Sequence, residues 1–281
     1  MIWPVETMLG EGPAWIRDQL WFVDIKGGKL HRYDPSSQER KSFEVGGAPS
    51  FVVPTDGDAL LVGDGGALRL FDGETLGAPI ATIAMPAHNR TNDATVHASG
   101  HLWFGTMDDQ ERAASGAVYR FDGETIRAVG GECTITNGPA ISPDGRTLYH
   151  VDTLAGTIVA FDIAGDDALT DGVLFATIAP EDGNPDGVTV DSEGSVWVGL
   201  WGGWEARRYA PDGTLQARVA LPCANVTKVA FGGPDLRTGY VTTARAGLSA
   251  GQLAEQPLAG GLFAFDAPAP GLPLPAVRLA R

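Results

Sequence analysis

Short runs of alternating apolar and polar residues recur along the chain, and many end in an aromatic residue followed by aspartate. The run Leu68-Arg69-Leu70-Phe71 is an example, and alternation with a period of two is typical of a β-strand with one buried face. The aromatic–aspartate pairs are Tyr33-Asp34, Phe71-Asp72, Phe121-Asp122, Phe161-Asp162 and Phe265-Asp266, with a degenerate copy at Tyr209-Ala210-Pro211-Asp212. Their spacing of roughly 40 to 50 residues indicates an internal repeat.

Each copy of the repeat carries two more strand-like segments before this pair. The nearer segment is apolar, as at residues 20–23 and 102–104, and turn-forming pairs such as Asp144-Gly145 precede most of these segments. Such pairs between apolar runs are typical of β-hairpins. A short apolar segment comes before the turn, and the stretches between copies, such as residues 76–85 and 169–178, leave room for a fourth strand.

Six such units predict an all-β protein, a six-bladed β-propeller with four-stranded antiparallel blades. The units account for almost the whole chain, so we expect a single domain over residues 1–281. The ring must close, because an open ring leaves a strand edge exposed. We expect residues 2–7 to close it by pairing with the C-terminal strand near residues 276–279. The alternative is a β-sandwich with coincidental repetition.

The composition supports many short strands joined by tight turns. The chain has 38 glycines and 19 prolines without a strict triplet period, which argues against a helical or collagen-like protein. Hydrophobic residues make up 43% of the chain and charged residues 20%, a balance that excludes wholesale disorder. The net charge of −15 argues against nucleic acid or an anionic membrane as a partner.

Several features predict a cytoplasmic location. No apolar run reaches the length of about 18 residues that a transmembrane helix needs, and residues 1–6 lack a signal-peptide pattern. Cys133 and Cys223 are far apart and belong to no Cys-x-x-Cys motif. We therefore expect two reduced, buried thiols.

One position of the repeat, just before the first strand of each unit, carries oxygen-bearing side chains in four of the six units. The residues are Glu11, Asn92, Asn137 and Asp186, while the second and sixth units have Ala48-Pro49-Ser50 and Thr227-Lys228. Equivalent positions of a propeller lie on one circle around its axis. The repeat alone therefore predicts that these four side chains converge at one mouth of the central channel.

Two carboxylates and two amides aimed at one point form an oxygen-rich set of ligands for a divalent cation. The five histidines are scattered, and no zinc-binding pattern of histidine or cysteine is present. The alternative is that pairs such as Asn137-Gly138 and Asp186-Gly187 merely form turns. Four oxygen-bearing residues at one repeat position favour the metal site.

The repeat and the residues at this position make the chain resemble the SMP-30/gluconolactonase family of sugar lactonases over its full length. The similarity extends to the bacterial xylonolactonase branch through Trp21-Phe22-Val23-Asp24-Ile25-Lys26 and Trp201-Gly202-Gly203. The motifs that carry the family resemblance are Leu9-Gly10-Glu11-Gly12-Pro13, Asn89-Arg90-Thr91-Asn92-Asp93, Trp103-Phe104-Gly105-Thr106-Met107, Asn137-Gly138-Pro139-Ala140-Ile141, Pro185-Asp186-Gly187 and Phe231-Gly232-Gly233-Pro234.

The resemblance implies a six-bladed propeller and assigns roles to five residues. Glu11, Asn137 and Asp186 fall on the family's metal ligands, and Arg90 and Asn92 fall on its substrate-contacting pair. One departure bears on the sugar contacts: where some members carry a substrate-binding glutamate after Gly-Thr-Met, this chain reads Asp108-Asp109-Gln110.

The expected reaction is hydrolysis of a lactone, a cyclic ester, which needs a polarised carbonyl and an activated water. A divalent cation, whether Fe(II), Ca, Zn, Mn or Mg, supplies both. Asp186 is the candidate general base as well as a candidate ligand. The expected substrate is a sugar aldonolactone, a pentonolactone such as D-xylonolactone or L-arabinonolactone, with gluconolactone also accepted. Two alternatives remain, a phosphotriesterase-like hydrolase and a non-catalytic propeller scaffold with a structural ion.

Overall fold

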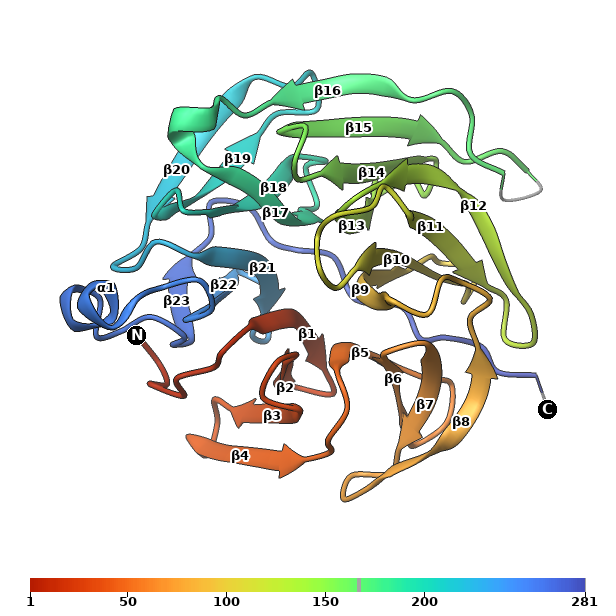
Figure 1. Cartoon of the computed structure of the whole chain (residues 1–281), viewed down its shortest axis with the longest axis horizontal. Helices are drawn as coiled ribbons and strands as arrows, with labels where there is room; N and C mark the ends of the chain where they lie inside the picture. The colour runs from red at the N-terminus through yellow and green to blue at the C-terminus, as the bar shows by residue number, and fades with distance from the viewer. Residues whose placement is uncertain (166–167, 281) are drawn as a thin grey trace.

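The computed structural model, which describes residues 1–165 and 168–280, has six antiparallel sheets arranged around a central axis (Figure 1). This arrangement is the predicted six-bladed β-propeller. Within these residues, five sheets have four named strands and the sixth has three. The strands of each blade follow chain order from the axis outward, and the innermost strands of neighbouring blades contact one another around the ring.

The strands occupy four concentric positions. The innermost are β1 (Gly10–Ile16), β5 (Pro49–Pro54), β9 (Asn89–Val96), β13 (Thr136–Ile141), β17 (Asn184–Val190) and β21 (Val226–Gly232). The second are β2 (Gln19–Asp24), β6 (Leu60–Asp64), β10 (Leu102–Asp108), β14 (Thr147–Asp152), β18 (Val196–Trp201) and β22 (Thr238–Thr243). The third are β3 (Lys29–Asp34), β7 (Ala67–Phe71), β11 (Gly116–Phe121), β15 (Thr157–Asp162), β19 (Glu205–Tyr209) and β23 (Phe263–Asp266). The outermost are β4 (Glu39–Glu44), β8 (Leu76–Thr82), β12 (Ile126–Cys133), β16 (Val173–Thr177) and β20 (Leu215–Ala220).

The two residues of the repeated aromatic–aspartate pair have different structural roles. Phe71 is fully buried between blades, whereas Asp72 closes the turn to β8. Its Oδ1 accepts hydrogen bonds from the backbone N–H groups of Glu74 at 2.9 Å and Thr75 at 2.8 Å. An aspartate here offers the backbone a local acceptor, which is why this residue type recurs at turns.

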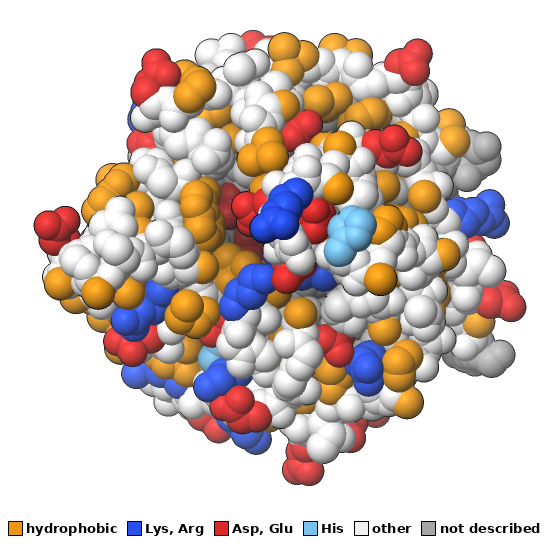
Figure 2. Space-filling view, in the orientation of Figure 1, with side chains coloured by type: hydrophobic (Ala, Val, Ile, Leu, Met, Phe, Trp, Pro, Cys, Tyr) orange, Lys and Arg blue, Asp and Glu red, His pale blue; other side chains and the backbone are white. Residues whose placement is uncertain are grey.

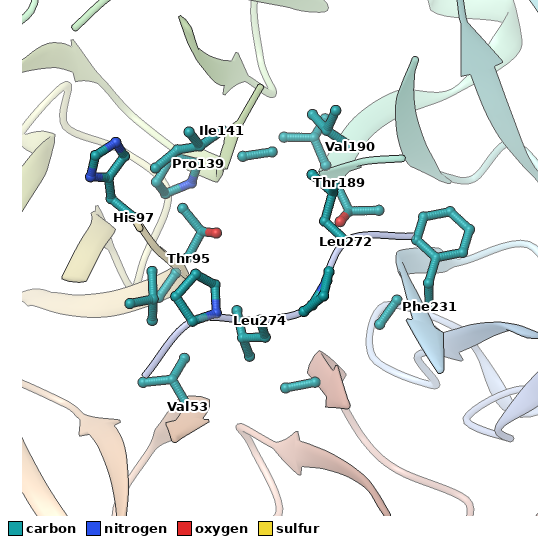
Figure 3. Close-up of a pocket in the computed structure, with 18 of the residues that line it drawn as sticks. Val53, Thr95, His97, Pro139, Ile141, Thr189, Val190, Phe231, Leu272 and Leu274 are labelled. Carbon is teal, nitrogen blue, oxygen red and sulfur yellow. The ribbon is translucent and has the colours of Figure 1, made fainter. Parts of the chain in front are cut away.

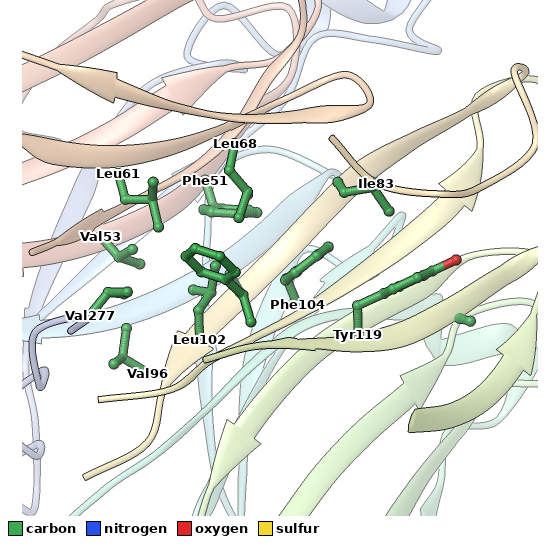
Figure 4. Packing of buried hydrophobic residues seen from close by; sticks show 13 residues of the cluster. Phe51, Val53, Leu61, Leu68, Ile83, Val96, Leu102, Phe104, Tyr119 and Val277 are labelled. Atoms are coloured by element: carbon green, nitrogen blue, oxygen red, sulfur yellow. The ribbon is translucent and has the colours of Figure 1, made fainter. Parts of the chain in front are cut away.

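The hydrophobic core is divided among the contacts between neighbouring blades. Blades 2 and 3 bury a cluster that includes Phe51, Leu68 and Phe104, whose side chains interdigitate in Figure 4. The rings of Phe104 and Tyr119 stack with their centroids 5.6 Å apart. Comparable clusters fill the other five contacts between blades in the described chain. Packing of sheet against sheet thus holds the ring together.

The N-terminal segment closes the ring on the last blade, as predicted, but it pairs with Leu262 rather than with residues 276–279. Trp3 pairs with Leu262, just before β23, through hydrogen bonds of 3.2 and 2.8 Å, so the N-terminal segment forms the outer edge of blade 6. Residues 276–279 do not pair with it: Val277 instead donates a 2.8 Å hydrogen bond to Pro54 in blade 2. The prolines of the C-terminal segment lack the N–H groups that a blade strand needs.

Helices contribute little to the fold. The described residues contain one short α-helix, α1 (Ala250–Glu255), and one turn of 3₁₀ helix at Pro180–Asp182. Neither has the length or apolarity required to cross a membrane. Cys133 and Cys223 are free and buried, as predicted.

Candidate metal and substrate site

Every innermost strand is irregular at the repeat position occupied by Glu11, Asn92, Asn137 and Asp186 in four of the blades. The pairing register of β1 with β2 shifts between Glu11 and Ala14, and that of β13 with β14 shifts between Asn137 and Ala140. The other four innermost strands shift register at the corresponding place. Such bulges turn side chains out of the alternation of the strand. Asn137-Gly138 and Asp186-Gly187 therefore lie inside strands, and the interpretation as simple turns is wrong.

Glycines beside the site residues permit the close approach of neighbouring blades. Gly12 has φ of +53°, and a Cβ atom there would lie 3.0 Å from the carbonyl oxygen of Ser50. A Cβ atom at Gly187 would lie 2.8 Å from that of Lys228. A glycine after the oxygen-bearing residue thus keeps the circle of site residues narrow.

The two predicted carboxyl ligands lie side by side in the channel. Glu11 is 4% exposed and Asp186 is 7% exposed. Burial, with the negative charge of Asp93 adding to it, raises the pKa of Glu11 from 4.5 to about 7. Burial and the charge of Glu11 raise the pKa of Asp186 well above its usual value, and a hydrogen bond between the two side chains acts in the same direction. Two buried carboxyls that resist simultaneous ionisation form a site with a deficit of positive charge.

The two amides are held in a hydrogen-bonded chain beside the carboxyls. Asn92 donates from Nδ2 to Oδ1 of Asn137 at 2.8 Å and to the backbone oxygen of Thr136 at 2.8 Å. Asn137 donates from Nδ2 to Oγ1 of Thr153 at 2.9 Å. These contacts fix the orientation of the Asn137 amide, whose oxygen accepts the hydrogen bond from Asn92 and whose nitrogen donates to Thr153.

Arg90 links the amides to the rim of the site. Its Nη1 donates to Oδ1 of Asn92 at 2.7 Å, and its Nε donates to Oδ1 of Asp109 at 2.7 Å. The charge of Arg90 also lowers the pKa values of Glu11 and Asp186, which places the guanidinium near both carboxyls. The structure therefore brings all five predicted site residues into one group.

A buried ion pair that sequence reasoning did not assign to the site lies beside these residues. Lys228 donates from Nζ to both carboxylate oxygens of Asp93, at 2.5 and 2.6 Å, and both residues are almost fully buried. Their positions in the sequence hinted at a place near the site, because Asp93 directly follows Asn92 and Lys228 directly follows the equivalent residue of blade 6, Thr227. Without coordinates, neither residue could be matched with a partner 135 positions away.

The Asp93–Lys228 pair also borders a second cavity farther along the axis. This cavity of about 460 Å³ is lined mainly by apolar residues of the innermost strands, including Val53, Ile141, Val190 and Phe231 (Figure 3). Leu272 and Leu274 of the C-terminal segment cover it. Glu11, Asn137 and Asp186 are not among its lining residues, so the candidate site and the cavity are different spaces.

The face shown in Figure 2 has a central hollow with acidic side chains inside it and basic side chains beside it. This distribution agrees with the burial of Glu11 and Asp186 among neighbours that include Arg90.

The donor set of the candidate site fits a hard divalent cation. Two buried carboxyls and one oriented amide oxygen offer oxygen ligands only, and a cation of charge +2 would relieve the repulsion that raises both pKa values. No group of three His, Cys, Asp or Glu side chains suited to a metal ion occurs among residues 1–165 and 168–280. The third protein ligand would therefore have to be the amide of Asn137.

Comparisons with known proteins agree with the sequence and the fold. A family model described as SMP-30/gluconolactonase/LRE-like region matches residues 9–245. A 6-deoxy-6-sulfogluconolactonase of Pseudomonas putida is 33% identical over 271 residues, covering 94% of this chain and 93% of the relative. A pentonolactonase of Haloferax volcanii is 36% identical over 277 residues, covering 94% and 93%. The crystal structure of a calcium-binding protein, regucalcin, from Agrobacterium tumefaciens superposes with a TM-score of 0.91 at 27% identity, covering 99% of this chain and 96% of that one.

Proposed function

Because the chain belongs to the SMP-30/gluconolactonase/LRE-like family, we propose that it is a metal-dependent sugar lactonase that opens an aldonolactone to its aldonic acid. The observation that carries the proposal is the convergence of two buried carboxyls, an oriented amide and an arginine at one end of the channel. A propeller that served only as a scaffold has no need of this arrangement.

Glu11, Asn137 and Asp186 would hold the cation. When bound there, a divalent cation would polarise the lactone carbonyl and lower the pKa of water. Glu11 supplies charge, and Asn137 supplies a neutral oxygen whose direction is fixed by Thr153. Arg90 and Asn92 bind the sugar through hydrogen bonds to its hydroxyl and ring oxygens, since both are anchored and carry donors.

Asp186 is proposed as the general base. When Asp186 is ionised, its carboxylate accepts a proton from the attacking water and returns that proton to the leaving ring oxygen. The neighbouring positive charge of Arg90 favours the ionised form of Asp186, opposing the effects of burial and Glu11. The product of hydrolysis is an open-chain aldonic acid, whose negative charge favours its release from an acidic site.

We propose a pentonolactone as the preferred substrate, with gluconolactone also accepted. A ring of polar groups suits a small polyol and would leave hydrogen-bonding groups unpaired around a fatty acyl chain. One relative is named for pentonolactone and another for a sulfonated gluconolactone. The family thus includes a member named for a charged sugar lactone. The residues around the site therefore determine whether neutral or charged lactones are preferred.

Acid release from D-xylonolactone, D-gluconolactone, a long-chain acyl-homoserine lactone and an organophosphate triester tests the proposal. Xylonolactone should be hydrolysed fastest, gluconolactone more slowly, and the other two at background rates. A preference for the organophosphate would support the phosphotriesterase alternative, and inactivity on all four would support a scaffold. A preference for gluconolactone would overturn only the choice of ring size.

A further inference from the structure

Asp109 lies at the rim of the candidate site and binds two basic side chains through one oxygen. Its Oδ1 accepts a 2.7 Å hydrogen bond from Nε of Arg90 and a 2.6 Å hydrogen bond from Nζ of Lys26. Arg90 belongs to β9 in blade 3, whereas Lys26 lies in the turn after β2 in blade 1. A single carboxylate therefore spans the mouth between two blades and pairs with both cations.

The site has an inner end and an outer end, which fixes where each part of a sugar lactone would lie. The side chain of Asp109 is 44% exposed and that of Lys26 is 42% exposed, whereas Glu11 and Asp186 are buried. The lactone carbonyl must reach the inner carboxyls. The far end of the sugar would then lie among Arg90, Asp109 and Lys26 at the rim.

Other basic side chains at this end of the propeller are also paired with carboxylates. Arg245 pairs with Glu6 at 3.0 Å, and Arg207 pairs with Asp182 at 2.9 Å. Arg112, in the loop that follows Asp109, has no ion-pair partner among the described residues. Arg112 apart, these basic side chains are all paired, so the rim offers an anionic sugar little free positive charge, and the inner carboxyls add repulsion.

We propose that Asp109 is a specificity-determining positioning residue, which neutralises Lys26 and orients Arg90 so that the site selects neutral aldonolactones over lactones with an anionic group at the far end. This inference rests on the proposed lactonase function. Asp109 holds Nε of Arg90, so that Nη1 faces Asn92. Its charge cancels one of the two cations that would otherwise bind a phosphate or sulfonate.

The test compares D-gluconolactone with its 6-phosphate, two lactones that differ only by the anionic group. Wild-type protein should prefer the neutral lactone by about tenfold or more in kcat/KM, because an added anion meets paired cations. Asp109→Asn leaves Lys26 and Arg90 without that carboxylate. It should shrink the preference about tenfold, chiefly through a lower KM for the phosphate, at low ionic strength.

Two controls separate positioning from a change in fold or total charge. Asp109→Glu keeps the charge and should retain the wild-type preference. Asp58→Asn makes the same charge change in the exposed turn between β5 and β6, at the other end of the propeller, and should leave both lactones unaffected. Thermal unfolding should show the same midpoint for all variants within a few degrees, since the Asp109 carboxylate is 44% exposed and solvent weakens its ion pairs.

Four outcomes would overturn the inference. A wild-type preference for the phosphate, or an unchanged ratio in Asp109→Asn, would refute the role of Asp109 while leaving lactonase activity established. An equal shift in Asp58→Asn would assign the effect to net charge rather than to the rim. Absence of hydrolysis of either lactone by wild-type protein would refute the proposed function and this inference with it.

Discussion

At the scale of single residues, the candidate site is a balance of buried charges. Glu11 and Asp186 have raised pKa values because they are buried beside each other and near Asp93. Lys228, which is paired with Asp93, lowers the pKa of Glu11 but does not outweigh burial and Asp93, so the pair does not supply the missing positive charge. The site therefore favours protons or a cation, and cation binding should release protons and strengthen as pH rises.

This balance predicts how the metal-free protein responds to pH. The pKa of Glu11 rises from 4.5 to about 7 on folding, so the folded state binds the extra proton between these values. Stability of the chelated protein should therefore fall as pH increases from about 4.5 through 7, by up to about 3 kcal/mol from this group. In Glu11→Gln the fall should be smaller, and the melting temperature at pH 8 with chelator should be higher than in wild type.

Melting curves at several pH values in chelator, with Asp58→Asn as the charge-matched control, measure this effect. An equal or steeper loss of stability with pH in Glu11→Gln would contradict the assigned electrostatics.

Asp186 and Asn92 should differ in the kinetic parameter that they control. Asp186→Asn removes a charge from the cation site and the proposed base, so kcat should fall by about a thousandfold. Asn92→Ala removes an anchored hydrogen-bonding group and should chiefly raise KM for xylonolactone, by about tenfold. Steady-state kinetics with the cation in excess measures both. A larger loss of kcat in Asn92→Ala would reverse the roles.

At the scale of strands, the bulge in each innermost strand places the site. The sequence predicted the blades, their turns and the circle of oxygen-bearing residues, because each follows from a repeating local pattern. It did not show that Asn137-Gly138 and Asp186-Gly187 lie inside bulged strands, since the same pairs also suit turns. It also missed the pairing of Lys228 with Asp93 and of Asp109 with Lys26, because each pair joins two different blades and depends on how the ring closes.

The bulge in β17 can be tested at Gly187. A Cβ atom there would lie 2.8 Å from that of Lys228, so Gly187→Ala should displace Lys228 or Asp186 and cost about 1 to 3 kcal/mol of stability. Activity should fall by a larger factor than stability explains, because Asp186 is adjacent. Gly57→Ala is the matched control, since its Cβ would meet only Oγ1 of Thr55 at 3.7 Å. Denaturant unfolding and lactone hydrolysis should separate the two variants; equal behaviour would argue against a tight bulge.

At the scale of the whole molecule, the ring is closed by the N-terminal segment and its far opening is crossed by the C-terminal segment. Trp3 packs against Phe22 with ring centroids 5.7 Å apart and pairs with Leu262, so it joins blades 1 and 6. Val277 and Arg278 attach the C-terminal segment to Pro54 and Gly100. The sequence predicts a single domain over residues 1–281. If these attachments couple the blades, all six blades should unfold together.

Calorimetry of Trp3→Ala tests this closure. Loss of the half-buried ring should lower stability by about 2 kcal/mol, while the transition stays single, with equal calorimetric and van't Hoff enthalpies. Trp204→Ala is the control, because Trp204 is 45% exposed and its removal should change stability by less than about 0.5 kcal/mol. Separate transitions in wild-type protein would contradict a single domain.

The central claim is that this propeller hydrolyses a sugar lactone with a cation held by Glu11, Asn137 and Asp186. The most direct measurement is xylonolactone hydrolysis by metal-stripped protein, titrated with single divalent cations while circular dichroism monitors the fold. Stripped protein should remain folded and lose activity by about a hundredfold or more. At least one cation should restore it in wild type, with far weaker restoration in Glu11→Gln. Full activity in the stripped, folded protein would contradict the account.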